Sequence, residues 1–311
     1  MSSLSIRLLG RLSVRRDGQP VADLQSHKAQ ELLAYLLLHR ERSQRREVLA
    51  ALMWPGNGSG VARKYLRHTL WQLQKALESV NSSGREDWLL TDPDWIWLNS
   101  EAGLWLDVSE FELAYASVRG VSGRYLDQWQ VEAVEKALAL YRGDLLEGWY
   151  DDWCLFERER LKQLYLVLLE KHMVYCETQG EYEIGLASGV RALRCDVAHE
   201  RTHRRMMRLY YLSGDRTRAL RQYERCAAFL RQELGVEPGA HTAALHRQIR
   251  SDRPLALAGT PSNGEDASFE NSPSLVEALG RLRQLQLACA ALECQLQEAI
   301  ETIQAPQGQH S

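Results

Sequence analysis

Apolar and polar residues alternate over the first 25 residues of the chain. Leu4, Ile6 and Leu8 fall on one side of an extended backbone, which is the period of a half-buried strand. Asp17-Gly18 has the composition of a tight hairpin turn. We therefore expect a small antiparallel sheet at the start of the chain.

The apolar period changes to three or four residues at Ser26, which is a candidate helix N-cap. This pattern predicts a helix from Ser26 onward, a second over 45–53 and a third over 61–79. Residues 88–98 form two extended runs around Asp92-Pro93-Asp94, which predict a hairpin. A sheet, three helices and a terminal hairpin are the plan of a winged helix-turn-helix.

From about residue 106 to residue 250 the apolar pattern is helical throughout and contains an internal repeat. The segments GEYEIGL, from Gly180, and GDRTRAL, from Gly214, match at a spacing of 34 residues. This is the period of tetratricopeptide helix hairpins, which place Gly at the turn between helices and a small residue five positions later. We expect tetratricopeptide-like helices over 106–250.

The rest of the chain has a different composition. Residues 251–274 hold three of the eight prolines with Ser, Asn and Gly, which predicts a flexible linker. Over 275–304, apolar residues step by three and four, as in a coiled-coil-like amphipathic helix. Two roles for this helix stay open, namely pairing two copies as a homodimer or packing back onto the helical domain.

Charge is distributed unevenly along the chain. The first 80 residues contain 13 Lys and Arg against 6 Asp and Glu, whereas the whole chain contains 38 against 41. A basic N-terminal region followed by an acidic remainder predicts that the N-terminal region binds a polyanion. We find no apolar run of membrane-spanning length, no secretory signal at the start and no C-x-x-C pair. We expect a cytoplasmic protein without a membrane partner.

The helix over 61–79 carries the most informative signal. Placed at helical intervals, one side is apolar: Ala62, Leu66, Leu70, Leu73 and Leu77. The opposite side carries the candidates for reading base edges in the DNA major groove: Lys64, Arg67, His68, Trp71 and Lys75. Four of these five are basic or can become so, and a large aromatic faces outward. Both features favour DNA contact over an ordinary solvated helix face.

Further basic residues fall where a helix-turn-helix meets the DNA backbone. The candidate phosphate contacts are Lys28, Arg42, Arg45, Arg46 and Arg63. Asp94 and Trp95 mark the tip of the expected wing, which is a candidate to enter a minor groove, although its acidic side chains argue against close phosphate contact.

One motif suggests metal catalysis. His199 and His203 enclose an H-E-x-x-H spacing, which sets two imidazoles one helical turn apart for zinc. Arg201 puts a cation between these ligands, however, and the segment falls in the second repeat unit. The glycine-rich loop at 56–60 is interpreted as a turn, and no G-x-x-x-x-G-K-[ST] phosphate loop occurs. We expect no enzyme, no metal and no cofactor.

Several segments resemble the SARP-type bacterial transcriptional activators. Their DNA-binding half is similar to HKAQELLAYLLLHRERSQRREVLAALMWP, ARKYLRHTLWQLQKAL and WLDVSEFELA. Their bacterial transcriptional activator domain is similar to LYRGDLLEGW, ERERLKQLYLVLLE and MMRLYYLSGDRTRALRQYERCAAFLRQELGVEPGAHTAALHRQI. The resemblance covers about residues 4–250 in order.

This resemblance implies an OmpR-like winged helix over 1–105 followed by tetratricopeptide-like helices over 106–250. It implies a recognition helix at 62–79, a helix–helix loop at 55–60 and a wing at 89–98. Family members bind direct repeats upstream of target genes and recruit RNA polymerase. Double-stranded DNA and RNA polymerase are therefore the implied partners, and the implied role is transcriptional activation.

The expected fold is mainly α, with an N-terminal winged helix-turn-helix (α+β), an all-α tetratricopeptide-like domain and a C-terminal helix. A second function stays open. Tetratricopeptide surfaces bind peptides and a winged helix can bind protein, so the chain can also be a protein-interaction scaffold.

Overall fold

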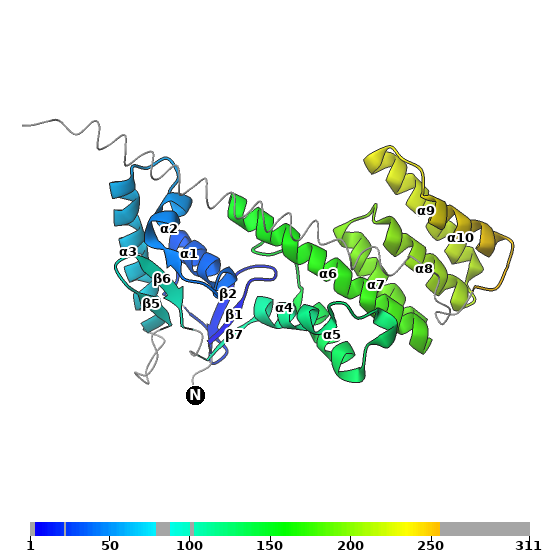
Figure 1. The fold of residues 1–311 in the computed structure, drawn as a ribbon, viewed down its shortest axis with the longest axis horizontal. Helices are drawn as coiled ribbons and strands as arrows, with labels where there is room; N and C mark the ends of the chain where they lie inside the picture. The colour runs from blue at the N-terminus through cyan, green and yellow to red at the C-terminus, as the bar shows by residue number, and fades with distance from the viewer. Residues whose placement is uncertain (1–3, 22, 79–87, 100–102, 256–311) are drawn as a thin grey trace, which may run out of the picture. The chain divides into compact units, whose positions relative to one another are not determined.

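The computed structural model describes residues 4–21, 23–78, 88–99 and 103–255. The chain divides into two compact units. The first contains the described part of 4–109 together with Leu145–Phe156, and the second contains Glu110–Asp144 and 157–255 (Figure 1). The expected C-terminal helix, and the expected linker from residue 256 on, lie outside the described residues.

A four-stranded sheet opens the first unit. Its strands, in the spatial order β3-β2-β1-β7, are β3 (Gln19–Pro20), β2 (Ser13–Arg16), β1 (Leu4–Arg7) and β7 (Leu104–Leu106). The predicted turn joins β2 to β3, with positive φ at both Asp17 and Gly18. Leu4, Ile6 and Leu8 are buried, which confirms the predicted alternation. The sequence did not predict β7, which pairs with β1 in parallel.

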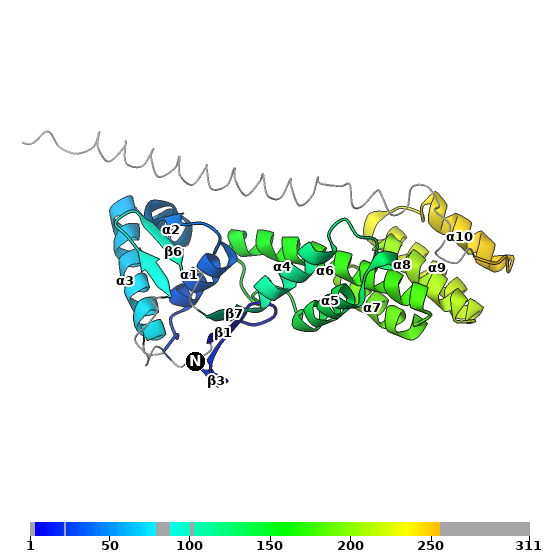
Figure 2. The ribbon, with the colours of Figure 1, turned by 60° about the horizontal axis from the view of Figure 1, so that its bottom comes forward.

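Three helices and a hairpin follow in the predicted order, together with one short strand that the sequence did not predict. They are α1 (His27–Leu38), β4 (Gln44–Arg45), α2 (Arg46–Met53), α3 (Ser59–Glu78), β5 (Leu89–Thr91) and β6 (Trp95–Leu98). Ser26 is the N-cap residue of α1, but its side chain makes no capping hydrogen bond. Ser59 and Gly60, predicted in a loop, instead form the first turn of α3. Both ribbon views show α3 beside α2 and the β5–β6 hairpin (Figure 2).

A later segment of the chain completes the first unit. The backbone N–H groups of Leu146 and Glu147 donate to the carbonyls of Leu8 and Gly10. The Trp153 ring meets the Tyr35 ring of α1 edge to face at a centroid distance of 5.4 Å. The core under α1 is therefore built in part from residues that lie far along the sequence.

The second unit is helical. Its elements are α4 (Asp107–Val118), the 3₁₀ turn η1 (Gly123–Tyr125), α5 (Gln128–Leu140), α6 (Asp152–Gln179), α7 (Tyr182–Cys195), α8 (Glu200–Leu212), α9 (Arg216–Leu234) and α10 (Ala240–Arg250). The first residues of α4 and α6 belong to the first unit. The predicted mainly helical fold with a small N-terminal sheet is confirmed.

The repeat seen in the sequence corresponds to two matching helix turns. Gly180 joins α6 to α7 with φ +76°, and Gly214 joins α8 to α9 with φ +85°. After each glycine the next N–H donates five residues back, from Glu181 to the Cys176 carbonyl and from Asp215 to the Tyr210 carbonyl. The small residues five positions after the two glycines, Gly185 and Ala219, are both buried. In the part of the chain that the structure describes, we find no helix with the length and apolar character of a membrane span.

Candidate nucleic-acid interface

Helix α3 has two chemically opposite faces. Its inner face is buried against α1 and α2, and no residue of this face exposes more than 4% of its surface: Ala62, Leu66, Leu70, Leu73 and Leu77. Because these residues recur every three or four positions, one side of the helix is fixed in the core. The other side then has to face away from it.

The outer face of α3 is cationic and aromatic. Its predicted residues are all exposed: Lys64, Arg67, His68, Trp71 and Lys75. Trp71 is 56% exposed, although an indole of this size is usually well covered. The His68 ring lies 6.0 Å from it in a stacked orientation, and the Lys75 ammonium lies 5.3 Å from its centroid. Within the described residues, none of these cations has a carboxylate at ion-pair distance.

The start of α2 is joined to the wing. Strand β4 pairs with β6 in the register Arg45↔Trp95, and the Arg46 N–H donates to the Asp94 carbonyl at 2.8 Å. The Arg45 guanidinium also lies 5.9 Å from the Trp95 ring centroid. The hairpin is therefore hydrogen bonded to the helix-turn-helix and does not move as a free loop. The sequence did not predict this connection, because β4 is only two residues long.

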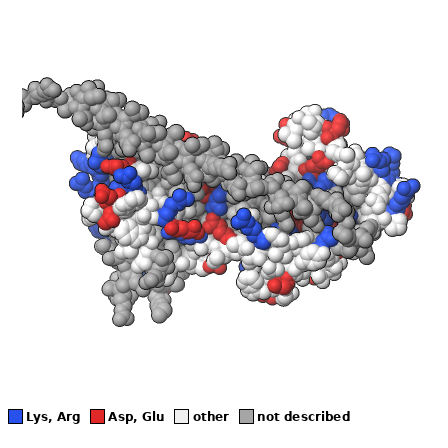
Figure 3. All heavy atoms as spheres, viewed as in Figure 1, with Lys and Arg blue, Asp and Glu red and all other residues white. Residues whose placement is uncertain are grey.

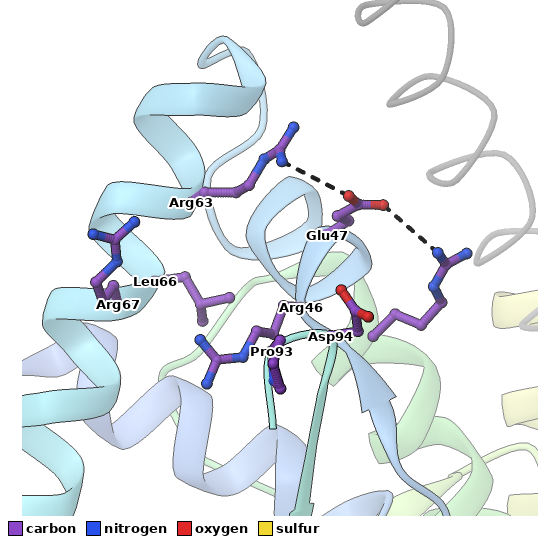
Figure 4. A pocket seen from close by; sticks show the side chains of 8 residues that line it. Arg46, Glu47, Arg63, Leu66, Arg67, Pro93 and Asp94 are labelled. Carbon is purple, nitrogen blue, oxygen red and sulfur yellow. Dashed lines mark ion pairs between the residues drawn. The ribbon is translucent and has the colours of Figure 1, made fainter. Parts of the chain in front are cut away.

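A pocket lies where α2, α3 and the wing tip meet (Figure 4). It holds about 150 Å³ and is lined by Arg45, Arg46, Glu47, Arg63, Leu66, Arg67, Pro93 and Asp94. Four guanidinium groups and two carboxylates thus surround one small space. A bound anion would therefore compete with the Glu47 and Asp94 carboxylates for these guanidinium groups.

Glu47 lies between two of the predicted phosphate contacts. Its carboxylate oxygens are 3.8 Å from Arg45 Nη2 and 3.8 Å from Arg63 Nη1, as the dashed lines in Figure 4 show. Arg46 differs from both, because its Nε is buried and has no hydrogen-bond acceptor in the described structure. The sequence analysis did not single out Glu47, although it follows Arg45 and Arg46 directly.

The remaining predicted phosphate contacts differ in their surroundings. Arg42 is exposed in the turn before β4. The Lys28 ammonium, in contrast, lies 2.7 Å from the Glu31 carboxylate and donates to the Met53 carbonyl at 2.8 Å. These contacts bind Lys28 into the domain and favour a structural role for it.

Lys and Arg side chains gather over α2 and α3, with acidic side chains among them (Figure 3).

The H-E-x-x-H motif is part of the helical packing. His199 precedes α8 as its N-cap residue, and its Nδ1 is 2.7 Å from the Thr202 hydroxyl. Both ring nitrogens of His203 have partners, the Val197 carbonyl and the Gln222 amide. The Glu200 carboxylate accepts from the Gly239 N–H at the start of α10. Among the described residues, no group of three or more His, Cys, Asp or Glu is placed to hold a metal ion.

The chain is similar to known proteins over both units. Residues 106–250 match the bacterial transcriptional activator domain. The chain is 26% identical over 261 residues to the transcriptional regulatory protein EmbR of Mycobacterium tuberculosis (strain CDC 1551), covering 81% of this chain and 64% of that protein. It is 25% identical over 280 residues to the regulatory protein AfsR of Streptomyces coelicolor, covering 89% of this chain and 27% of that protein.

A solved structure shares the fold. It is that of Mycobacterium tuberculosis EmbR in complex with a low-affinity phosphopeptide, with a TM-score of 0.66 and 24% identity, covering 82% of this chain and 67% of that one. The chain spans less than two thirds of the length of the curated relatives EmbR and AfsR. The comparisons confirm the resemblance to SARP-type transcriptional activators that the sequence indicated.

Proposed function

Because the chain carries a bacterial transcriptional activator domain over residues 106–250, we propose that it is a sequence-specific DNA-binding transcriptional regulator. In this proposal it activates transcription by binding promoter repeats and recruiting RNA polymerase. Its similarity to transcriptional regulatory proteins over both units supports the role.

The single observation that carries DNA binding is the outer face of α3. A helix of this size fits the major groove, where Arg and Lys pair with guanine edges. The cations on this face are exposed and have no described carboxylate partner, so they can pair with base edges without first breaking an ion pair. Lys64, Arg67, His68, Trp71 and Lys75 would read bases, and Arg42, Arg45, Arg46 and Arg63 would contact phosphates.

The tip of the wing would approach a DNA minor groove beside α2 rather than the phosphates. Its tip, at Asp94 and Trp95, is hydrogen bonded and stacked onto the start of α2. Asp94 repels phosphate, so the wing would contribute through Trp95 and through its rigid attachment rather than through charge.

The helical unit would serve protein contacts, with RNA polymerase as the expected partner by family resemblance. We propose no catalytic activity for the chain and a cytoplasmic location. The four described cysteines are free thiols, as is usual in a reducing compartment: Cys154, Cys176, Cys195 and Cys226.

A homodimer through 275–304 remains a prediction. If the chain dimerises in this way, removing residues 275–311 would lower the mass measured by light scattering.

Titration of fluorescent random duplex with the full chain tests DNA binding. We expect salt-sensitive binding, with log K falling by about 0.9 per neutralised phosphate for each log unit of salt. Replacing Lys64, Arg67 and Lys75 together by Gln should reduce the affinity for a duplex obtained by site selection at least tenfold. The matched control replaces Lys136, Arg221 and Arg225, which are exposed cations of the helical unit.

Two outcomes would contradict the proposal. Absence of binding at low salt would favour the protein-interaction scaffold instead. An equal loss of affinity in both triple variants would show that net charge, and not the α3 face, attracts DNA. If the chain does bind DNA, selection of binding sites from randomised duplexes would define the operator sequence.

A further inference from the structure

We propose that Glu47 is a specificity-determining residue that occupies Arg45 and Arg63 until α3 is seated at its proper site. The proposal rests on the proposed function, because it concerns how the same surface distinguishes specific from random DNA. Glu47 is not itself a DNA contact. It acts through the two arginines that it bridges.

The geometry places Glu47 as an internal competitor for phosphate. One oxygen of its carboxylate faces Arg63 on α3, and the other faces Arg45 at the start of α2 (Figure 4). A DNA phosphate would present the same chemistry to these guanidinium groups, namely anionic oxygens held between two cations. Glu47 and phosphate therefore cannot both be bound closely.

The ion pairs of Glu47 are suited to exchange. Both N···O distances, at 3.8 Å, exceed those of charge-assisted hydrogen bonds, which are about 2.7–2.9 Å. The three side chains are also 40–55% exposed, so water and salt screen their attraction. A phosphate that arrives in register can form shorter bonds with the same arginines. The ion pairs are thus weak enough for a phosphate to replace them.

A second observation shows that the pocket is suited to an anion. Arg46 Nε is buried among the pocket residues and has no described acceptor. A buried donor without an acceptor carries a desolvation cost that a phosphate oxygen would remove. Glu47 therefore occupies the outer arginines of the pocket and leaves the inner donor of Arg46 available for the phosphate.

This arrangement would affect random DNA more than the specific site. On random duplex, binding comes almost entirely from phosphates, and no base contact fixes the register of α3. Glu47 then keeps its arginines and binding stays weak. At the specific site, base contacts of α3 hold the backbone against the pocket, so the phosphate displaces Glu47. The acid would therefore increase the ratio of specific to random affinity.

The test compares Glu47→Gln with the wild-type full chain, using random duplex and a duplex obtained by site selection. Relative to the wild type, we expect the affinity of the variant for random duplex to rise at least about fivefold. Its affinity for the selected duplex should rise by less than half of that factor. Its salt slope on random duplex should steepen by about 0.9 for each arginine released. Glu41→Gln is the matched control, because this exposed acid lies in the same unit and has no arginine partner among the described residues.

A double-mutant cycle identifies the route of the effect. In an Arg63→Met background, Glu47→Gln should raise the affinity for random duplex less than it does in the wild type. Equal gains on both duplexes, or equal gains in Glu47→Gln and Glu41→Gln, would overturn the proposal and leave DNA binding standing. Failure of the wild type to bind any duplex would overturn both. Circular dichroism melting of each variant checks that the fold is retained.

Discussion

The carboxylate of Asp107 accepts hydrogen bonds from the backbone N–H of Leu8, at 2.9 Å to one oxygen and 3.0 Å to the other. The two residues are 99 positions apart in sequence. Asp107 also accepts from the N–H groups of Leu9 and Val108, and it is almost completely buried. A single side chain at the start of α4 thus satisfies the backbone donors that follow β1.

Replacing Asp107 by Asn should destabilise the first unit. The amide retains one acceptor oxygen but points an NH₂ group at backbone donors, so buried N–H groups lose their partners. We expect the free energy of unfolding to fall by about 1–3 kcal/mol, measured by urea denaturation of the full chain. Asp23→Asn is the control, because Asp23 is an exposed acid of the same unit. Equal effects of the two variants would contradict the assigned role.

The Asp107 contact marks a limit of prediction from sequence. Local alternation predicted β1 and β2, because the side-chain period and the Asp17-Gly18 turn lie within a few neighbouring residues. The parallel pairing of β1 with β7 depends on residues about one hundred positions apart. No local period encodes such a partner, and β7 is only three residues long. The segment Leu145–Phe156 escaped prediction for the same reason.

Two glycines of the helical unit should respond to alanine for different reasons. Gly214 has φ +85° and open space around it, so Gly214→Ala should cost about 1–2 kcal/mol of backbone strain. At Gly123 an added Cβ would overlap the Lys171 carbonyl, which belongs to backbone and cannot easily move. Gly123→Ala should therefore cost more, about 3 kcal/mol or above.

Thermal and urea unfolding of the full chain measure both effects. Gly60→Ala provides the control, because Gly60 lies in the first turn of α3 with open space around it. That variant should be neutral or more stable by up to about 1 kcal/mol. If Gly123→Ala were as mild as Gly60→Ala, the close packing of η1 against α6 would be wrong.

Buried ion pairs between α6 and α8 should make the helical unit sensitive to acid. The Glu177 carboxylate lies 2.6 Å from Arg208 and 3.0 Å from Arg205, and its side chain is only 1% exposed. Burial alone would raise the pKa of Glu177, but Arg208 and Arg205 outweigh it and lower the pKa below its ordinary value of 4.5. The neighbouring Glu170 pairs with Arg205 as well, and its pKa is also lowered.

The sign of the pH effect follows from these lowered pKa values. A carboxylate with a lower pKa in the folded state stabilises the fold above its ordinary pKa, and this contribution is lost as pH falls through the folded pKa. We expect the melting temperature to fall steeply below about pH 4.5. Glu177→Gln should lower the free energy of unfolding by about 3 kcal/mol near pH 7 and should make the fall of the melting temperature below pH 4.5 less steep. The exposed Glu183 supplies the control, since Glu183→Gln should leave the pH profile unchanged.

At the candidate interface, the sequence predicted what depends on one helix alone. The period of α3 placed Leu66 inside and Arg67 outside, because helical geometry fixes the angle between them. It did not predict that Lys28 is bound to Glu31 and the Met53 carbonyl, or that Glu47 reaches Arg63. The Lys28–Glu31 pair lies within α1, but the contact of Lys28 with Met53 joins α1 to α2 and that of Glu47 with Arg63 joins α2 to α3, so these two depend on how the helices pack.

Arg67 on α3 and Arg46 on α2 should contribute differently to DNA binding, one to sequence discrimination and the other to overall affinity. Arg67 is exposed on the face of α3 proposed to read bases, so Arg67→Ala should lose about 1–3 kcal/mol of discrimination between the selected site and a mismatched one. Arg46 would contact phosphate, so Arg46→Ala should weaken all duplexes about equally and reduce the salt slope by about 0.9. Anisotropy titrations against selected, mismatched and random duplexes at several salt concentrations separate the two patterns. Arg221→Ala, an exposed arginine of α9, should change neither quantity. If Arg67→Ala and Arg46→Ala shifted every duplex by the same factor, the base-reading role of α3 would have to be abandoned.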